Sequence, residues 1–116
     1  MKTSSRDHPS RDQGRVRIVA VEGDVDLSSS GELRRVLFEA LRGVSRLAVN
    51  LGGIRYLDSS GIATLIEVLK ESQKTKTEFA LFAMSPAVHE VFRLTHVIKI
   101  FQVYETEEQA VGGAGA

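Results

Sequence analysis

The 116-residue sequence contains no cysteine, no tryptophan and only two prolines. Without cysteine, the chain can form neither a disulfide bond, nor a zinc site built on thiolates, nor a cysteine nucleophile. It also lacks an excess of charge of either sign, because 15 basic residues balance 15 acidic ones. Nucleic acids and anionic lipids attract strongly positive surfaces. We therefore expect no direct binding of nucleic acid.

Long apolar runs are absent as well. No stretch approaches the roughly 18 apolar residues of a membrane span, and no early run resembles a signal peptide. We therefore expect a cytoplasmic protein without membrane insertion. Metal-ligand spacing does not occur, and Gly52-Gly53 is followed by neither a Walker-type lysine nor G-x-G-x-x-G. No metal and no cofactor are predicted.

What the chain does contain is a regular alternation of strand and helix patterns. Strands are predicted over residues 15–21, 46–51, 78–84 and 97–104. Helices are predicted to begin near Ser29, Ser59, Ser85 and Thr106, with capping boxes at Ser29–Glu32 and Thr106–Gln109. This alternation predicts an α/β domain with a largely parallel sheet, whose functional sites gather after the carboxyl ends of strands.

The two ends of the chain differ from this pattern. Residues 1–14 are polar and contain Pro9, which predicts a flexible N-terminal arm or at best a weak edge strand. Residues 112–116 are glycine-rich and predict a flexible tail. The folded domain is therefore expected over residues 15–111.

The stretch Asp58-Ser59-Ser60-Gly61 opens the second helix, predicted over residues 59–72. The buried stripe of this helix is expected to hold Ile62, Leu65, Ile66 and Leu69, with Thr64 outside it. The simplest interpretation of the stretch is a helix cap, because Asp and Ser are preferred there. A serine nucleophile would need a base, but no G-x-S-x-G elbow is present and none of the three histidines is an obvious partner. No enzyme is predicted.

A third interpretation is a phosphorylation switch on Ser59. A phosphate adds about −1.5 to −2 charges, which the dipole of the following helix partly offsets. Across an interface, a like-charge pair about 5 Å apart costs roughly 3 kcal/mol at an effective dielectric constant near 20. Affinity would then fall by more than about a hundredfold. The phosphate could therefore eject a protein partner while the domain stays folded.

A second polar segment, residues 23–30, follows the first predicted strand. The two segments should therefore meet at one edge of the sheet. Asp24 and Asp26 are most simply solvated acids of a turn, but they also form a candidate docking patch for basic side chains.

The pattern Leu51-x-x-Ile54-x-Tyr56-Leu57-Asp58-Ser59-Ser60-Gly61-Ile62 resembles the signature of the STAS-domain anti-sigma factor antagonists of bacteria. Three further segments agree with this resemblance: Gly23-x-Val25-Asp26, Ser85-Pro86-Ala87-Val88 and residues 101–109. The resemblance covers residues 15–111. It implies the STAS fold, with a four- or five-stranded, mostly parallel (mixed) sheet flanked by helices. The polar segment at residues 1–14 departs from the family, which usually has an alternating first strand there.

The resemblance also implies a function. The unphosphorylated protein would bind an anti-sigma factor and so free a sigma factor for transcription. That partner is typically a serine kinase as well, which would phosphorylate Ser59 and release itself, and a PP2C-type phosphatase would reset the switch. The residues that we assign to partner binding are Asp24, Asp26, Asp58, Ser60, Gly61, Ile62 and Thr64.

Two alternatives remain open. A stand-alone STAS subunit or scaffold of a lipid-transport ATPase or another signalling complex would keep the fold and change the partner. An α/β enzyme or nucleotide-binding protein is the other alternative, and the missing phosphate-binding motif argues against it.

Overall fold

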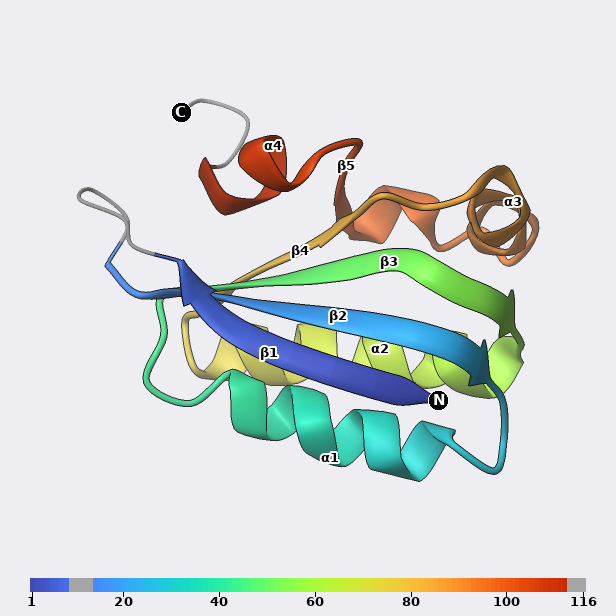
Figure 1. The fold of residues 1–116 in the computed structure, drawn as a ribbon, viewed down its shortest axis with the longest axis horizontal. Helices are drawn as coiled ribbons and strands as arrows, with labels where there is room; N and C mark the ends of the chain where they lie inside the picture. Colours follow the sequence, from blue (N-terminus) through green and yellow to red (C-terminus); the bar gives the residue numbers. More distant parts are fainter. Residues whose placement is uncertain (9–13, 113–116) are drawn as a thin grey trace.

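The computed structural model describes residues 1–8 and 14–112. Its centre is a five-stranded sheet in the order β1-β2-β3-β4-β5 (Figure 1). The strands are β1 (Lys2–His8), β2 (Val16–Val25), β3 (Arg46–Leu57), β4 (Glu78–Phe82) and β5 (Gln102–Tyr104). Strand β1 runs antiparallel to β2, and the other neighbouring pairs are parallel. The prediction of a mixed, mostly parallel sheet is therefore confirmed.

Four helices and one 3-10 turn flank the sheet. They are α1 (Ser30–Ala40), α2 (Ser59–Lys74), α3 (Pro86–Leu94), η1 (Ile98–Ile100) and α4 (Glu107–Gly112). Helices α1 and α2 lie side by side under one face of the sheet, α4 lies on the opposite face, and α3 lies towards the end of β3 (Figure 1). The arrangement has three layers, with the sheet in the middle.

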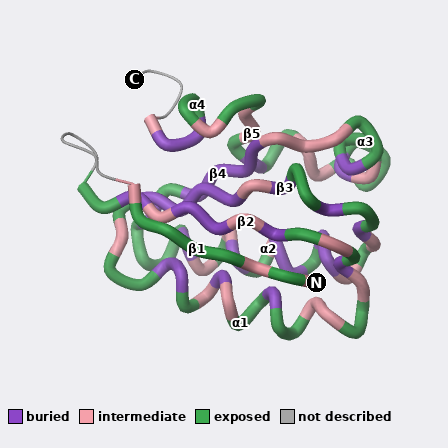
Figure 2. Tube along the Cα trace, viewed as in Figure 1, coloured by how far each residue is buried: buried purple, intermediate pink, exposed green. Residues whose placement is uncertain are grey.

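The larger core lies between the sheet and the α1–α2 layer and includes leucines of both helices and apolar side chains of β2 and β3. Figure 2 shows buried positions along both helices and both strands. A smaller core lies beneath α4 and includes Ile18, Ala48, Ala80 and Val111. The first half of β2 is therefore covered on both faces. This explains why residues 16–21 are almost entirely apolar rather than alternating.

The N-terminal segment is an edge strand over Lys2–His8, the second of the two predictions for residues 1–14. Its backbone pairs with β2 along its whole length, its side chains are mostly polar, and ion pairs join some of them to neighbouring elements. Asp7 pairs with Arg15 at 2.6 Å and with Arg17 at 2.9 Å, and Arg6 pairs with Glu107 of α4. Pro9 and residues 113–116, on which the predictions of an arm and a tail partly rest, lie outside the described residues.

Strand β3 runs six residues beyond the predicted end at Leu51 and carries the chain to Asp58. It gains one extra residue relative to β2 between Asn50 and Gly53, and another between Ile54 and Tyr56. The bulges bend the strand. At Gly53 a Cβ atom would lie 2.7 Å from the Cγ of Glu22, so the close approach of the strands requires glycine.

Several predicted boundaries are wrong. Residues 97–104 do not form one strand, because Ile98–Ile100 forms the 3-10 turn η1 and only Gln102–Tyr104 pairs with β4.

The capping box at Ser29 does not form, since the Ser29 hydroxyl accepts the N–H of Asp26 at 3.0 Å instead. The box at Thr106–Gln109 is confirmed by two reciprocal hydrogen bonds of 3.2 Å.

Candidate functional site

Strands β2 and β3 end at the same edge of the sheet, at the right of Figure 1. There the backbone N–H of Asp58 donates a hydrogen bond to the carbonyl oxygen of Val25 at 3.2 Å. This bond joins the loop before α1 to the loop before α2. The prediction that the two polar segments meet at one edge is confirmed.

The Asp58 side chain caps α2. Its Oδ1 atom accepts the backbone N–H groups of Ser60 at 2.9 Å and Gly61 at 3.3 Å, and it also accepts the Ser60 hydroxyl at 2.5 Å. The bond from the Ser60 hydroxyl is the main reason that the pKa of Asp58 is lowered, and the nearby Asp26 carboxylate acts weakly in the opposite direction. Asp58 is therefore a stably ionised cap at neutral pH.

Ser59 is the first residue of α2, and its side chain is exposed. Its hydroxyl makes no hydrogen bond within residues 1–8 and 14–112. The two adjacent serines therefore differ. The Ser60 hydroxyl is held by Asp58, whereas the Ser59 hydroxyl faces solvent at the positive end of the helix dipole.

Three of the residues assigned to partner binding lie beneath the surface. Ile62 and Thr64 are each 4% exposed, and Gly61 is buried. The Thr64 hydroxyl donates to the carbonyl oxygen of Ser60 at 3.0 Å, which satisfies it inside the protein. The prediction that Thr64 lies outside the buried stripe is therefore wrong. These residues can shape the surface but offer it little side-chain area.

Gly61 allows α2 to approach the strand ends closely. A Cβ atom at this position would lie 2.3 Å from the Cδ1 of Leu57 and 2.9 Å from the Cγ1 of Val25. Both neighbouring side chains are buried. The glycine therefore fixes how the start of α2, and with it Ser59, sits against β2 and β3.

Two further carboxylates lie near the end of β2. Asp24 is the second-last residue of the strand, and Asp26 directly follows the strand. Asp24 is exposed and pairs with Arg55 at 3.6 Å. Asp26 accepts the hydroxyl of Ser28 at 2.6 Å, and this bond is the main cause of its lowered pKa. With Asp58, these residues lie near the ends of β2 and β3, and we define Asp24, Asp26 and Asp58 as the acidic patch.

Comparison with known proteins places the chain in a family. The model of the STAS domain matches residues 9–110. The protein belongs to the STAS domain family. The anti-sigma F factor antagonist of Paenibacillus polymyxa is 26% identical to this STAS chain over 98 residues, which cover 83% of the chain and 84% of the relative.

Solved STAS structures share the fold. The anti-sigma factor antagonist from Mycobacterium paratuberculosis has a TM-score of 0.81 at 22% identity, over 99% of this chain and 96% of its own. The anti-sigma factor antagonist SpoIIAA in its unphosphorylated form has a TM-score of 0.73 at 18% identity, over 97% and 96%. SpoIIAA has also been solved in its phosphorylated form, with a TM-score of 0.65 over 96% of this chain and 99% of its own. The predicted STAS fold is confirmed.

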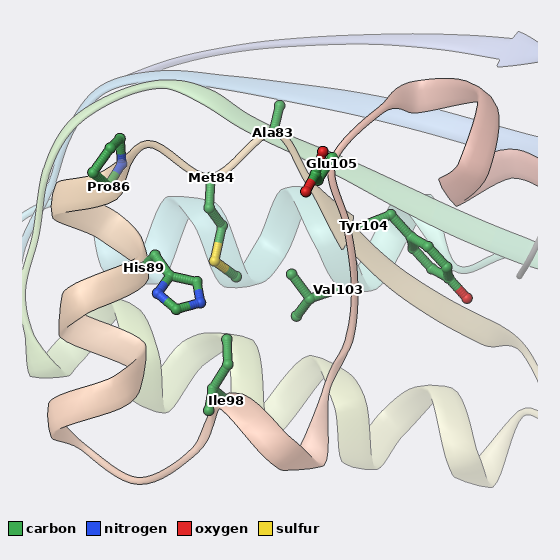
Figure 3. A pocket seen from close by; sticks show the side chains of 8 residues that line it. All are labelled: Ala83, Met84, Pro86, His89, Ile98, Val103, Tyr104 and Glu105. Atoms are coloured by element: carbon green, nitrogen blue, oxygen red, sulfur yellow. The ribbon is translucent and has the colours of Figure 1, made fainter.

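The STAS domain also has a hollow far along the chain from Ser59. It has a volume of about 780 Å³ and lies between α3, η1 and β5, with Met84, His89, Ile98 and Val103 in its lining (Figure 3). None of the residues assigned to partner binding lines it.

Within the described part of the chain, no three His, Asp or Glu side chains are grouped to hold a metal ion. Every helix there is too short or too polar to traverse a bilayer.

One exposed residue of the loop before α1 was not expected from the sequence. Leu27 follows Asp26 and is 80% exposed. Sequence reasoning gives no reason to expect an exposed leucine at a turn. A usable signal is present, however, because the spacing Asp-x-Ser occurs at both 26–28 and 58–60.

Proposed function

We propose that this STAS protein is an anti-sigma factor antagonist whose binding to an anti-sigma factor ends when Ser59 is phosphorylated. The partner is an anti-sigma factor with serine kinase activity, a PP2C-type phosphatase reverses the modification, and the exchange takes place in the cytoplasm. The proposal rests above all on the free hydroxyl of Ser59, which is exposed at the start of α2, directly after Asp58 of the acidic patch.

Two comparisons support the proposal. The relatives in the family that cover most of the chain are named anti-sigma factor antagonists. SpoIIAA has been solved both with and without its phosphate, and both forms resemble this chain. A protein of this fold therefore remains folded when it is phosphorylated.

The acidic patch explains why a phosphate on Ser59 acts mainly on the complex. Within the free protein, the phosphate stays in water, and the helix dipole offsets part of its repulsion from Asp58. In a complex, the interface excludes water, so the repulsion between the phosphate and the carboxylates of the patch is screened less than in the free protein. A like-charge pair about 5 Å apart costs roughly 3 kcal/mol at an effective dielectric constant near 20. We expect a loss of more than about a hundredfold in affinity.

The test uses purified protein, ATP and the candidate anti-sigma serine kinases of the source organism. Mass spectrometry should locate one phosphate, on Ser59. Ser59→Ala should stay bound to the partner in the presence of ATP, Ser59→Asp should bind weakly, and Ser60→Ala should still be phosphorylated on Ser59. Unchanged binding by both Ser59 variants would reject the switch. The stand-alone STAS subunit or scaffold would then be the better explanation.

A further inference from the structure

Two turns at the edge that carries Ser59 have the same hydrogen-bond pattern. In Asp58-Ser59-Ser60, the carboxylate of the first residue accepts the N–H of the third at 2.9 Å and its hydroxyl at 2.5 Å. In Asp26-Leu27-Ser28, the corresponding bonds are 3.0 Å and 2.6 Å. The first turn opens α2, and the second lies just before α1.

The middle residue of each turn takes no part in these bonds. The first and third side chains bond to each other, and the middle side chain is exposed in both turns. Ser59 occupies this position in one turn and is exposed. Leu27 occupies it in the other and is 80% exposed. Leu27 thus holds the same position in its turn as Ser59 holds in the other.

The exposure of Leu27 stands out within the described residues. The large apolar side chains exposed there are Leu27, Tyr56, Leu94 and Ile100, of which Leu27 is the most exposed. Tyr56, 54% exposed, lies opposite Asp24 in the pairing of β2 and β3, at the same edge. Apolar side chains among carboxylates form a surface suited to a protein partner rather than to a small polar ligand.

The turn also holds the backbone of Leu27 in place. The carbonyl oxygen of Asp26 accepts the N–H groups of Ser29 at 3.0 Å and Ser30 at 2.9 Å. The carbonyl oxygen of Leu27 itself accepts the Ser30 hydroxyl at 3.3 Å. A contact residue on a fixed backbone loses little conformational freedom when it binds.

We infer that Leu27 is an apolar anchor of the partner interface, and this inference rests on the proposed function. The anti-sigma partner is expected to carry an apolar pocket that receives the Leu27 side chain. Lysine or arginine side chains at the rim of that pocket would pair with Asp24, Asp26 and Asp58. Charge complementarity with the acidic patch, and the position of Leu27 directly after Asp26 of that patch, support this chemistry.

The test measures the affinity of unphosphorylated protein for the serine kinase that modifies Ser59, by isothermal titration calorimetry. Burial of a leucine side chain corresponds to about tenfold to a hundredfold in affinity, so Leu27→Ala should weaken binding by that factor. Leu27→Met should stay within about threefold of the wild type. Leu94→Ala is the matched control, because Leu94 is 61% exposed near the end of α3, and it should bind like the wild type.

The outcomes separate this inference from the function on which it rests. If the kinase binds the wild type and Leu27→Ala equally well, or if Leu94→Ala loses as much affinity as Leu27→Ala, the anchor is wrong and the proposed function stands. If no serine kinase of the source organism binds or modifies the wild type, the proposed function fails and the anchor fails with it. Thermal unfolding of each variant checks that the domain remains folded.

Discussion

The hydroxyl of Ser60 donates a hydrogen bond of 2.5 Å to the carboxylate of Asp58, and this contact distinguishes two adjacent serines. Ser60 is engaged in capping α2, which leaves the Ser59 hydroxyl exposed. The same contact is the main reason that the pKa of Asp58 is lowered. A change at Ser60 should therefore be detectable at Asp58.

Ser60→Ala should raise the pKa of Asp58 towards its usual value, because the largest stabilising contact of the carboxylate is lost. An NMR titration that follows the side-chain carboxyl carbons measures this directly. Ser28→Ala is the reciprocal control. It removes the main cause of the lowered pKa of Asp26, so it should raise the pKa of Asp26 and leave Asp58 nearly unchanged. An Asp58 titration that does not respond to Ser60→Ala would contradict the contact.

The lowered pKa of Asp58 also predicts how stability depends on pH. The folded state holds Asp58 ionised more strongly than the unfolded chain does, so this contribution is fully present above the unfolded pKa, about 3.9. It is lost as the pH falls through the lower, folded value. In Asp58→Asn, the midpoint of thermal unfolding should therefore fall less steeply than in the wild type as the pH drops below about 4.

In Asp26→Asn, the midpoint of thermal unfolding should also fall less steeply than in the wild type below about pH 4, because the pKa of Asp26 is lowered as well. Parallel curves for the wild type and both variants below about pH 4 would show that neither carboxylate is specially stabilised in the folded state.

Gly61→Ala tests how closely α2 approaches the strand ends. The new Cβ would lie 2.3 Å from the Cδ1 of Leu57 and 2.9 Å from the Cγ1 of Val25. Leu57 can rotate only within the core, and Val25 is stiff, so α2 must shift. We expect the free energy of unfolding to fall by about 1–3 kcal/mol, measured by urea denaturation. Amide NMR shifts around Ser59 should also move.

Gly31→Ala is the control for this substitution. Gly31 lies in the first turn of α1, and no atom would lie within 4 Å of its added Cβ. Because alanine favours helix over glycine, stability should stay the same or rise by up to about 1 kcal/mol. Equal losses at the two positions would contradict crowding at the strand ends as the cause, since no atom crowds an added Cβ at Gly31.

The parts of the fold that depend on local residue types could be predicted from the sequence. The start of α2 is one example, because the Asp58 side chain caps it by accepting backbone N–H groups only two and three residues away. Strand β1 was harder to predict, because the ion pairs that hold its polar side chains join Asp7 to Arg17 and Arg6 to the distant Glu107. An edge strand of this kind needs no apolar alternation.

The extension of β3 could not be predicted for a related reason. Gly52 and Gly53 indicate a turn in isolation, but here they belong to a bulged strand that approaches Glu22 closely. The burial of Thr64 in the candidate site could not be predicted either. The burial of Thr64 depends on the direction in which α2 docks, and on a hydroxyl whose hydrogen bond stays within its own helix.

Thr64→Val separates a structural role of Thr64 from a contact with the partner. The side chain is 4% exposed and its hydroxyl donates to the carbonyl oxygen of Ser60, which lies one turn earlier in α2. Valine has a similar shape and lacks the hydroxyl, so stability should change by no more than about 1 kcal/mol. Since the side chain does not reach the surface, affinity for the anti-sigma partner should stay within about threefold of the wild type, a difference of less than about 1 kcal/mol.

Ser59→Asp provides the comparison for Thr64→Val, because it places a charge on the exposed surface and should weaken the same binding strongly. Calorimetric titration and thermal unfolding of both variants give the two readouts needed. A tenfold loss of affinity in Thr64→Val with an unchanged unfolding midpoint would mean that Thr64 contacts the partner directly. In that case, the start of α2 would have to rearrange in the complex, because the hydroxyl is inaccessible in the free protein.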